Sequence, residues 1–128
     1  MVVMECEEGD AAGARHATAA FLASVCPWAD LDAVMLVVSE LVTNAAKHTA
    51  GWWRLRVQAF HSHLVVEIDD SSDVLPGPRT PDMTGRGGLG WHMVQQLATE
   101  VEVLRQAEGK TVRATWLRGA EPAAVPSV

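Results

Sequence analysis

A chain of 128 residues is long enough to form one domain that buries about two-thirds of its unfolded surface. Its formal net charge of −6 argues against a main role in coating DNA or RNA, because phosphate binding needs a cationic surface. The longest uninterrupted apolar run, Ala33 to Val38, is too short to cross a bilayer, and the N-terminus lacks the basic start of a signal peptide. These features predict a soluble, cytoplasmic domain without a membrane role.

The first part of the chain predicts a short strand and two helices. Residues Val2 to Glu5 fit an edge strand, and Asp10 can cap a helix from Ala11 to Val25. Asp30 can cap a second helix from Leu31 to His48, in which apolar residues recur at helical spacing. One face of this second helix should therefore pack on a core.

Three polar residues share one edge of the second predicted helix. Glu40 and Asn44 are one helical turn apart, and Lys47 lies beside them. Asn can supply a neutral oxygen ligand to Mg²⁺, Lys can balance phosphate charge, and Glu can accept a proton. The trio suits a site for a metal-bound polyphosphate, although on this helix alone a solvated flank is the more common arrangement.

The middle of the chain predicts an antiparallel hairpin. Residues 52–60 and 64–69 alternate apolar and polar side chains with the period of a half-buried strand. His61 and His63 in the turn have the spacing of a metal pair, but no third ligand is apparent nearby, which favours exposed turn histidines.

A long proline-containing segment, residues 71–84, precedes the glycine-rich stretch Gly85 to Gly90. Structureless segments of this length in a compact domain are usually lids, binding loops or linkers. The glycines open a predicted helix that includes Trp91 to Leu97, so backbone N–H groups and the helix N-terminus can face an anion, with Arg86 as an added cation. A dinucleotide fingerprint would need a strand directly before the glycines, and a P-loop would need a following Gly-Lys-Ser/Thr. A flexible hinge is the remaining alternative.

The chain closes with two predicted strands, residues 102–105 and 111–117, joined by a turn at residues 107–110. From Gly119 onward the composition predicts a frayed tail. We therefore expect a single domain over residues 1–118 and a flexible tail over residues 119–128. The two cysteines, Cys6 and Cys26, have no metal-ligand spacing and predict reduced, buried thiols.

The order of these motifs resembles the GHKL, or Bergerat-fold, ATP-binding superfamily. Residues 39–48 look like its N-box, residues 66–70 like the approach to its first glycine box, and residues 85–90 like its second. Within that superfamily the chain is most similar to the small bacterial anti-sigma-factor serine/threonine kinases. The resemblance implies an α+β fold: a two-layer α/β sandwich with a mostly antiparallel sheet, about three helices on one face, and an ATP-lid loop.

The resemblance also implies roles for individual residues. Glu40 would be the general base toward a serine or threonine hydroxyl, and Asn44 would hold the Mg²⁺ that bridges the ATP phosphates. Asp70 would accept a hydrogen bond from the adenine amino group. The implied ATP-binding set is Asn44, Lys47, Asp70, Ser72, Gly85, Arg86, Gly87, Gly88, Leu89, Gly90 and Thr111.

The function implied is that of an ATP-binding regulator that phosphorylates a serine or threonine of an anti-anti-sigma partner, sequesters a sigma factor, or does both. The alternative is a non-catalytic partner-binding module with degenerate or absent ATP binding. Ser72 and Val74 stand where the first glycine box normally has glycines. Serine can still form a hydrogen bond near the adenine, but Val74 favours this alternative, because its side chain occupies space where backbone would approach the base. The pattern leaves the oligomeric state open, a homodimer included.

Overall fold

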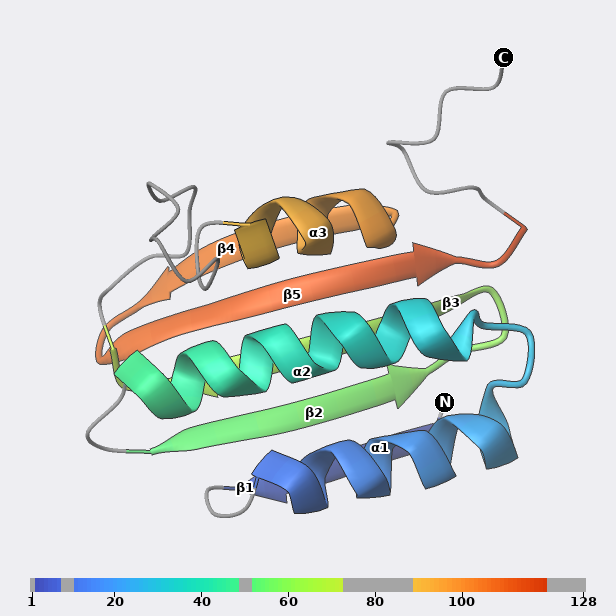
Figure 1. Cartoon of the computed structure of the whole chain (residues 1–128), viewed down its shortest axis with the longest axis horizontal. Coiled ribbons are helices and arrows are strands. Elements are labelled where there is room, and N and C mark those ends of the chain that lie inside the picture. Colours follow the sequence, from blue (N-terminus) through green and yellow to red (C-terminus); the bar gives the residue numbers. More distant parts are fainter. Residues whose placement is uncertain (1, 8–10, 49–51, 73–88, 120–128) are drawn as a thin grey trace.

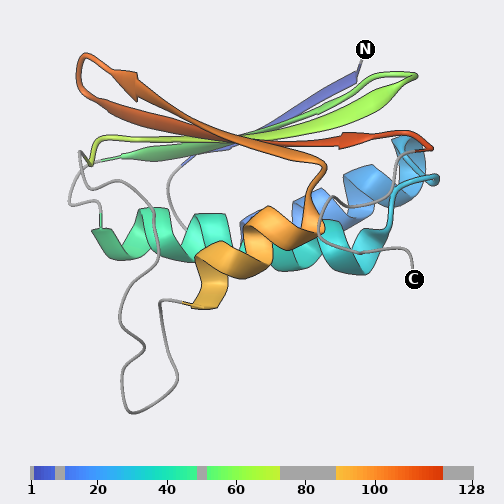
Figure 2. The same cartoon turned by 90° about the horizontal axis from the view of Figure 1, so that it is seen from above.

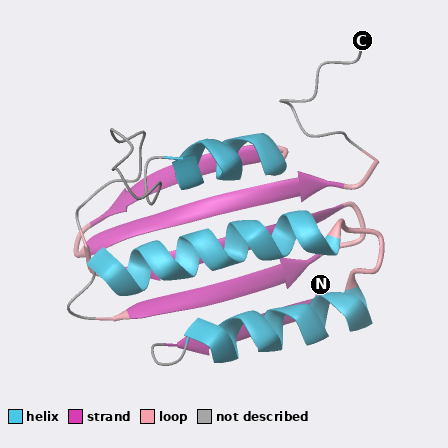
Figure 3. Ribbon diagram, in the orientation of Figure 1, coloured by secondary structure: helices cyan, strands magenta, loops and turns pink. Residues whose placement is uncertain are grey.

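The computed structural model of the chain describes residues 2–7, 11–48, 52–72 and 89–119. These residues form two layers, a sheet and three helices that cover one of its faces (Figures 1 and 2). Figure 3 separates the helices from the strands by colour. In chain order the elements are β1 (Val2–Glu7), α1 (Ala11–Val25), α2 (Leu31–His48), β2 (Trp53–Ala59), β3 (His63–Asp70), α3 (Leu89–Leu97), β4 (Glu100–Gln106) and β5 (Gly109–Leu117).

The five strands have the order β1-β2-β3-β5-β4, and every pair of neighbours is antiparallel. The predicted α+β class and two-layer architecture are confirmed. The two predicted helices have the predicted bounds, whereas the closing strands are longer than expected and leave a turn of only two residues, Ala107 and Glu108. The predicted Asp10 cap, most of the loop from 71 to 84 and the tail beyond Gly119 lie outside the described residues.

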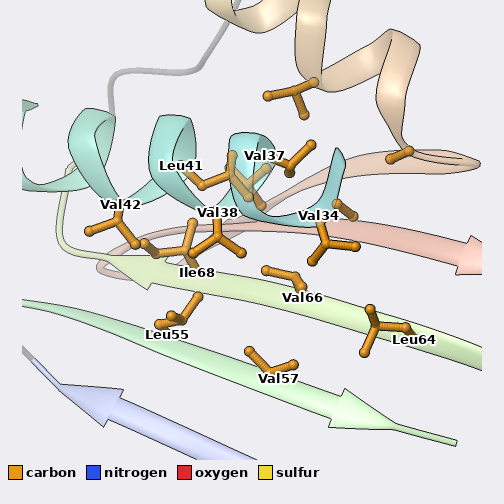
Figure 4. Packing of buried hydrophobic residues seen from close by; sticks show 14 of the residues in the cluster. Val34, Val37, Val38, Leu41, Val42, Leu55, Val57, Leu64, Val66 and Ile68 are labelled. Atoms are coloured by element: carbon orange, nitrogen blue, oxygen red, sulfur yellow. The ribbon is translucent and has the colours of Figure 1, made fainter. Parts of the chain in front are cut away.

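The core lies between α2 and the central strands. Apolar side chains from α2 point toward those of β2 and β3, as the close view of Figure 4 shows. Val38, Leu55 and Ile68, for example, are 0–1% exposed. Each such side chain stabilises the fold by about 1.5–3 kcal/mol relative to an exposed position. The labelled members of the cluster are Val34, Val37, Val38, Leu41, Val42, Leu55, Val57, Leu64, Val66 and Ile68.

The start of α2 is fixed by a side-chain cap. The Oδ1 atom of Asp30 accepts a hydrogen bond from the backbone N–H of Ala33 at 3.2 Å, and Asp32 lies in the first turn. Such a cap satisfies one of the N–H groups that have no partner inside the helix. The cap fixes the helix start, and with it the position of Glu40 along the sheet.

The face of the sheet that the helices leave uncovered carries a network of ion pairs. On β3, Glu67 and Asp69 point to this face, yet each residue is only 6% exposed. Arg54 and Arg56 of β2 both contact Oδ2 of Asp69, at 3.2 and 3.1 Å, and Arg113 of β5 contacts Glu67 at 3.0 Å. The guanidinium groups therefore pair with the two carboxylates and shield them from solvent, while part of each arginine side chain stays exposed. Among the described residues, the Nε atoms of Arg54 and Arg56 are buried without a hydrogen-bond partner.

Within the described ranges, no helix combines the length and the apolar character that a membrane crossing requires.

Candidate functional site

The site begins where α2 meets the first turn of α3. A Cβ atom built on Gly90 would lie 1.9 Å from Oε1 of Glu40 and 2.2 Å from its carboxyl carbon. These distances are far below any van der Waals contact, so the Glu40 carboxylate occupies the space that a side chain at residue 90 would fill. Glycine at this position is what allows the carboxylate to lie against the α3 backbone.

This contact places a negative charge at the positive end of a helix. Gly90 is the second residue of α3, and the first-turn N–H groups of a helix attract anions. Glu40 itself is half-buried, so part of its carboxylate remains accessible to solvent. Asn44 is also half-buried one turn further along α2, and Lys47 is exposed. The structure thus brings Glu40, one residue of the polar edge of α2, to the α3 N-terminus.

A second polar group lies at the end of β3. Asp70 continues the alternation of Leu64, Val66 and Ile68, which places it on the helix-covered face, at the same end of the domain as the C-terminus of α2 (Figure 1). Asp70 is 2% exposed. Its Oδ1 atom accepts a hydrogen bond of 2.8 Å from the backbone N–H of Ser72, which is itself buried.

Lys110 of β5 pairs with Asp70 across the strands. Its Nζ atom lies 3.0 Å from each carboxylate oxygen of Asp70, and its side chain is 7% exposed. The same ammonium lies 3.5 Å from the carbonyl oxygen of Ser72. Sequence reasoning missed Lys110, because it placed this residue in the turn between the last two strands. The register that sets Lys110 opposite Asp70 is the signal that would have found it.

Thr111 does not join the Asp70 group. It follows Lys110 on β5 and therefore points to the opposite face of the sheet, where its hydroxyl donates a hydrogen bond to Oδ1 of Asp69 at 2.5 Å. The sequence placed Asp69 with the outward-facing set near Glu67, and the structure confirms that placement.

A groove of about 280 Å³ lies at this end of the sheet. Asp70 and Lys110 contribute to its lining, together with the ion-paired residues of the helix-free face and the exposed ring of Trp52. The remaining lining residues are Arg54, Arg56, Asp69, Gln106, Glu108 and Thr111.

Several predicted site residues lie outside the described ranges: Gly85, Arg86, Gly87 and Gly88, together with Val74 of the preceding loop. Leu89 and Gly90 are described, as the first two residues of α3.

Metal-binding clusters of three or more histidine, cysteine or acidic side chains are absent from the described part of the chain. The ring of His63 stacks on Phe60 with 4.2 Å between centroids, and its Nδ1 lies 2.9 Å from the hydroxyl of Ser62. These contacts give His63 a packing role in the turn. Cys26 has a free, buried thiol, and burial raises its pKa.

The comparison with known families decides the assignment of this fold. A model described as the histidine kinase-like ATPase domain matches residues 4–116. The chain belongs to this family. The match confirms the resemblance to the GHKL superfamily that the N-box and glycine stretches indicate. A curated relative, the serine-protein kinase RsbW of Bacillus velezensis, is 32% identical over 108 residues, which cover 70% of this chain and 67% of the relative.

Solved structures of histidine kinases have the same fold. The histidine kinase domain of a blue-light activated kinase from Erythrobacter litoralis is 27% identical with a TM-score of 0.52, covering 69% of this chain and 44% of that one. The histidine kinase AdeS of Acinetobacter baumannii, 15% identical, gives a TM-score of 0.54 over 90% of this chain and 68% of that one. The catalytic domain of the histidine kinase ThkA, 13% identical, also gives 0.54, over 92% and 97%. This chain thus spans less than half of the first of these structures.

Proposed function

We propose that this domain binds Mg-ATP and transfers its γ-phosphoryl group to a serine or threonine hydroxyl of a small regulatory protein. The partner class we propose is an anti-anti-sigma factor, with the domain acting in the cytoplasm as an anti-sigma factor. Membership of the histidine kinase-like ATPase family and the similarity to a serine-protein kinase support this choice. The observation that carries it is the contact of the Glu40 carboxylate with Gly90, which joins the N-box helix to the end of the glycine stretch.

The described residues suit the chemistry of phosphoryl transfer. Mg-ATP would supply the phosphoryl group, and catalysis would consist mainly of positioning and charge stabilisation. Asn44 offers the neutral oxygen that suits Mg²⁺, and Lys47 offers a positive charge for phosphate on the same edge of α2. Glu40, half-buried and held against the α3 backbone, would take the proton from the attacking hydroxyl as its oxygen bonds to the γ-phosphorus and ADP leaves.

A second candidate function is supported by one observation. Both carboxylate oxygens of Asp70, the residue expected to accept from the adenine amino group, already contact the ammonium of Lys110. The side chains of this pair are also only 2–7% exposed, and such burial favours a partner-binding module with little or no nucleotide affinity.

Calorimetric titration of Mg-ATP into the free protein separates these two functions. Saturable heat supports the nucleotide-binding enzyme, whereas absence of heat at high protein concentration leaves only the partner-binding module.

The role of Glu40 is tested by the substitution Glu40→Ala. Proteins captured from the native cell lysate on the immobilised chain, with ATP and separately with ADP, would be incubated with γ-labelled ATP. We expect Glu40→Ala to abolish label transfer to a captured protein while calorimetric ATP binding persists. Asp32→Ala, in the first turn of the same helix, is the matched control and should transfer label at the wild-type rate. Equal transfer by the Glu40 variant would remove this residue from the mechanism.

The contact with Gly90 provides an independent variant. In Gly90→Ala the added methyl group requires the Glu40 carboxylate to move, because the two cannot share the same space. We expect transfer to fall in parallel with Glu40→Ala, while far-UV circular dichroism shows that α3 remains folded. Wild-type transfer by the Gly90 variant would show that the contact does not position the base.

A further inference from the structure

The position and the burial of the Asp70–Lys110 ion pair are not those that an ion pair serving stability alone would need. It lies on the helix-covered face at the end of the sheet that also carries the C-terminal half of α2 (Figure 1), and both side chains are almost fully buried. Burying an ion pair costs desolvation energy that its own attraction barely offsets. The position of the pair, rather than its contribution to stability, therefore calls for an explanation.

The hydrogen-bonding capacity of Asp70 is only partly used. An ionised carboxylate offers about four acceptor positions. On Oδ1, one position accepts from Ser72 and another faces Lys110, whereas among the described residues Oδ2 contacts Lys110 alone. Oδ2 can therefore accept one more N–H group without displacing the ammonium.

Lys110 has donor capacity at the same place. An ammonium group carries three N–H donors, and two of them serve the oxygens of Asp70. The remaining contact, to the carbonyl oxygen of Ser72, is 3.5 Å long and so is a weak hydrogen bond at best. The pair thus presents an acceptor, Oδ2 of Asp70, directly beside a donor that can be redirected.

We infer that Lys110 is a second base-recognition residue, which donates to the ring nitrogen N1 of adenine while Asp70 accepts from the adjacent amino group. The inference rests on the ATP binding proposed above. The amino group and N1 are neighbours on one edge of the adenine ring, a donor beside an acceptor, and this edge is complementary to the pair. Lys110 thereby reads an atom that Asp70 alone cannot recognise, since a carboxylate only accepts.

The wild-type protein tests the inference through its choice between two nucleotides. In 1-deaza-ATP a C–H group replaces N1, while the amino group and the phosphates are retained. Calorimetric titration should show 1-deaza-ATP binding about tenfold to a hundredfold more weakly than ATP, the loss expected for a hydrogen bond from a charged donor. Equal affinities would overturn the role of Lys110 and leave ATP binding intact.

The variant Lys110→Met should remove the discrimination. It should bind ATP and 1-deaza-ATP equally, yet still prefer ATP to purine riboside triphosphate, which lacks the amino group that Asp70 recognises. Arg105→Met is the matched control, because Arg105 is an exposed cation directly opposite Lys110 on β4. This control should discriminate between ATP and 1-deaza-ATP as the wild type does.

Two further results complete the test. A Lys110→Met variant that still discriminates against 1-deaza-ATP would overturn the inference, because another donor must then contact N1. If circular dichroism shows that this variant does not fold, the wild-type comparison decides alone. Absence of ATP binding by the wild type would overturn the proposed function itself, and is distinct from equal binding of the two nucleotides.

Discussion

Strand β3 carries acidic residues on both faces of the sheet, and their cationic partners are exposed to different degrees on the two faces. On the helix-free face, Glu67 and Asp69 contact arginines whose side chains are 29–39% exposed. On the helix-covered face, Asp70 contacts a lysine whose side chain is 7% exposed. The first arrangement leaves about a third of each arginine side chain exposed, so less of the cationic charge is removed from water. The second removes both charges from water, and such an arrangement is more often associated with a site than with stability.

Breaking the buried pair should have the largest effect on stability. Lys110→Met leaves the Asp70 carboxylate buried without its counter-charge, and we expect the free energy of unfolding to fall by about 3–5 kcal/mol. Urea denaturation followed by circular dichroism measures this change.

A double variant provides the control for this prediction. When Lys110→Met is combined with Asp70→Leu, both charges are removed, and most of the lost stability should return. A double variant as unstable as the single one would show that packing around Lys110, rather than the unpaired charge, causes the loss.

Much of the fold could be predicted from the sequence because its signals are local. The bounds of α2 follow from the apolar period and from the Asp30 cap, and the alternation in β3 correctly separates Asp69 from Asp70. The site could be predicted only in part. The pairing of Asp70 with Lys110 joins residues 40 apart in sequence, and its register is set by the sheet rather than by either segment.

The same dependence on strand register applies to the position of Thr111. A hydroxyl in the last hairpin is visible in the sequence, but the acidic residue of β3 beside which it lies is set by the register between β3 and β5. The strand starts at Gly109 and not at Thr111, so Lys110 is part of the ladder, and its pairing with Asp70 places it on the helix-covered face. Because side chains alternate along a strand, Thr111 then faces the other way.

A smaller effect is expected from trimming the apolar part of the helix-covered face. Ile68 lies two residues before Asp70 on the same face and is 1% exposed. Ile68→Val should reduce the free energy of unfolding by about 0.5–1.5 kcal/mol, the usual cost of one buried methyl group, without changing the preference for ATP over 1-deaza-ATP. Denaturation and titration of the same sample measure both quantities. A changed nucleotide preference would mean that packing below the pair, and not the pair alone, sets base recognition.

The smallest effect should come from the helix-free face, and it should depend on salt. Arg56 contacts both Asp69 and Glu67, at 3.1 and 3.9 Å, but its side chain is 29% exposed. Arg56→Gln should therefore cost at most about 1 kcal/mol. Arg54 and Arg113 still contact the two carboxylates, so neither acid loses its last cationic partner. The difference from wild type should shrink as NaCl is raised, because ions screen exposed charges more than buried ones. A salt-independent loss as large as that of Lys110→Met would mean that the ion pairs on the two faces contribute equally to stability.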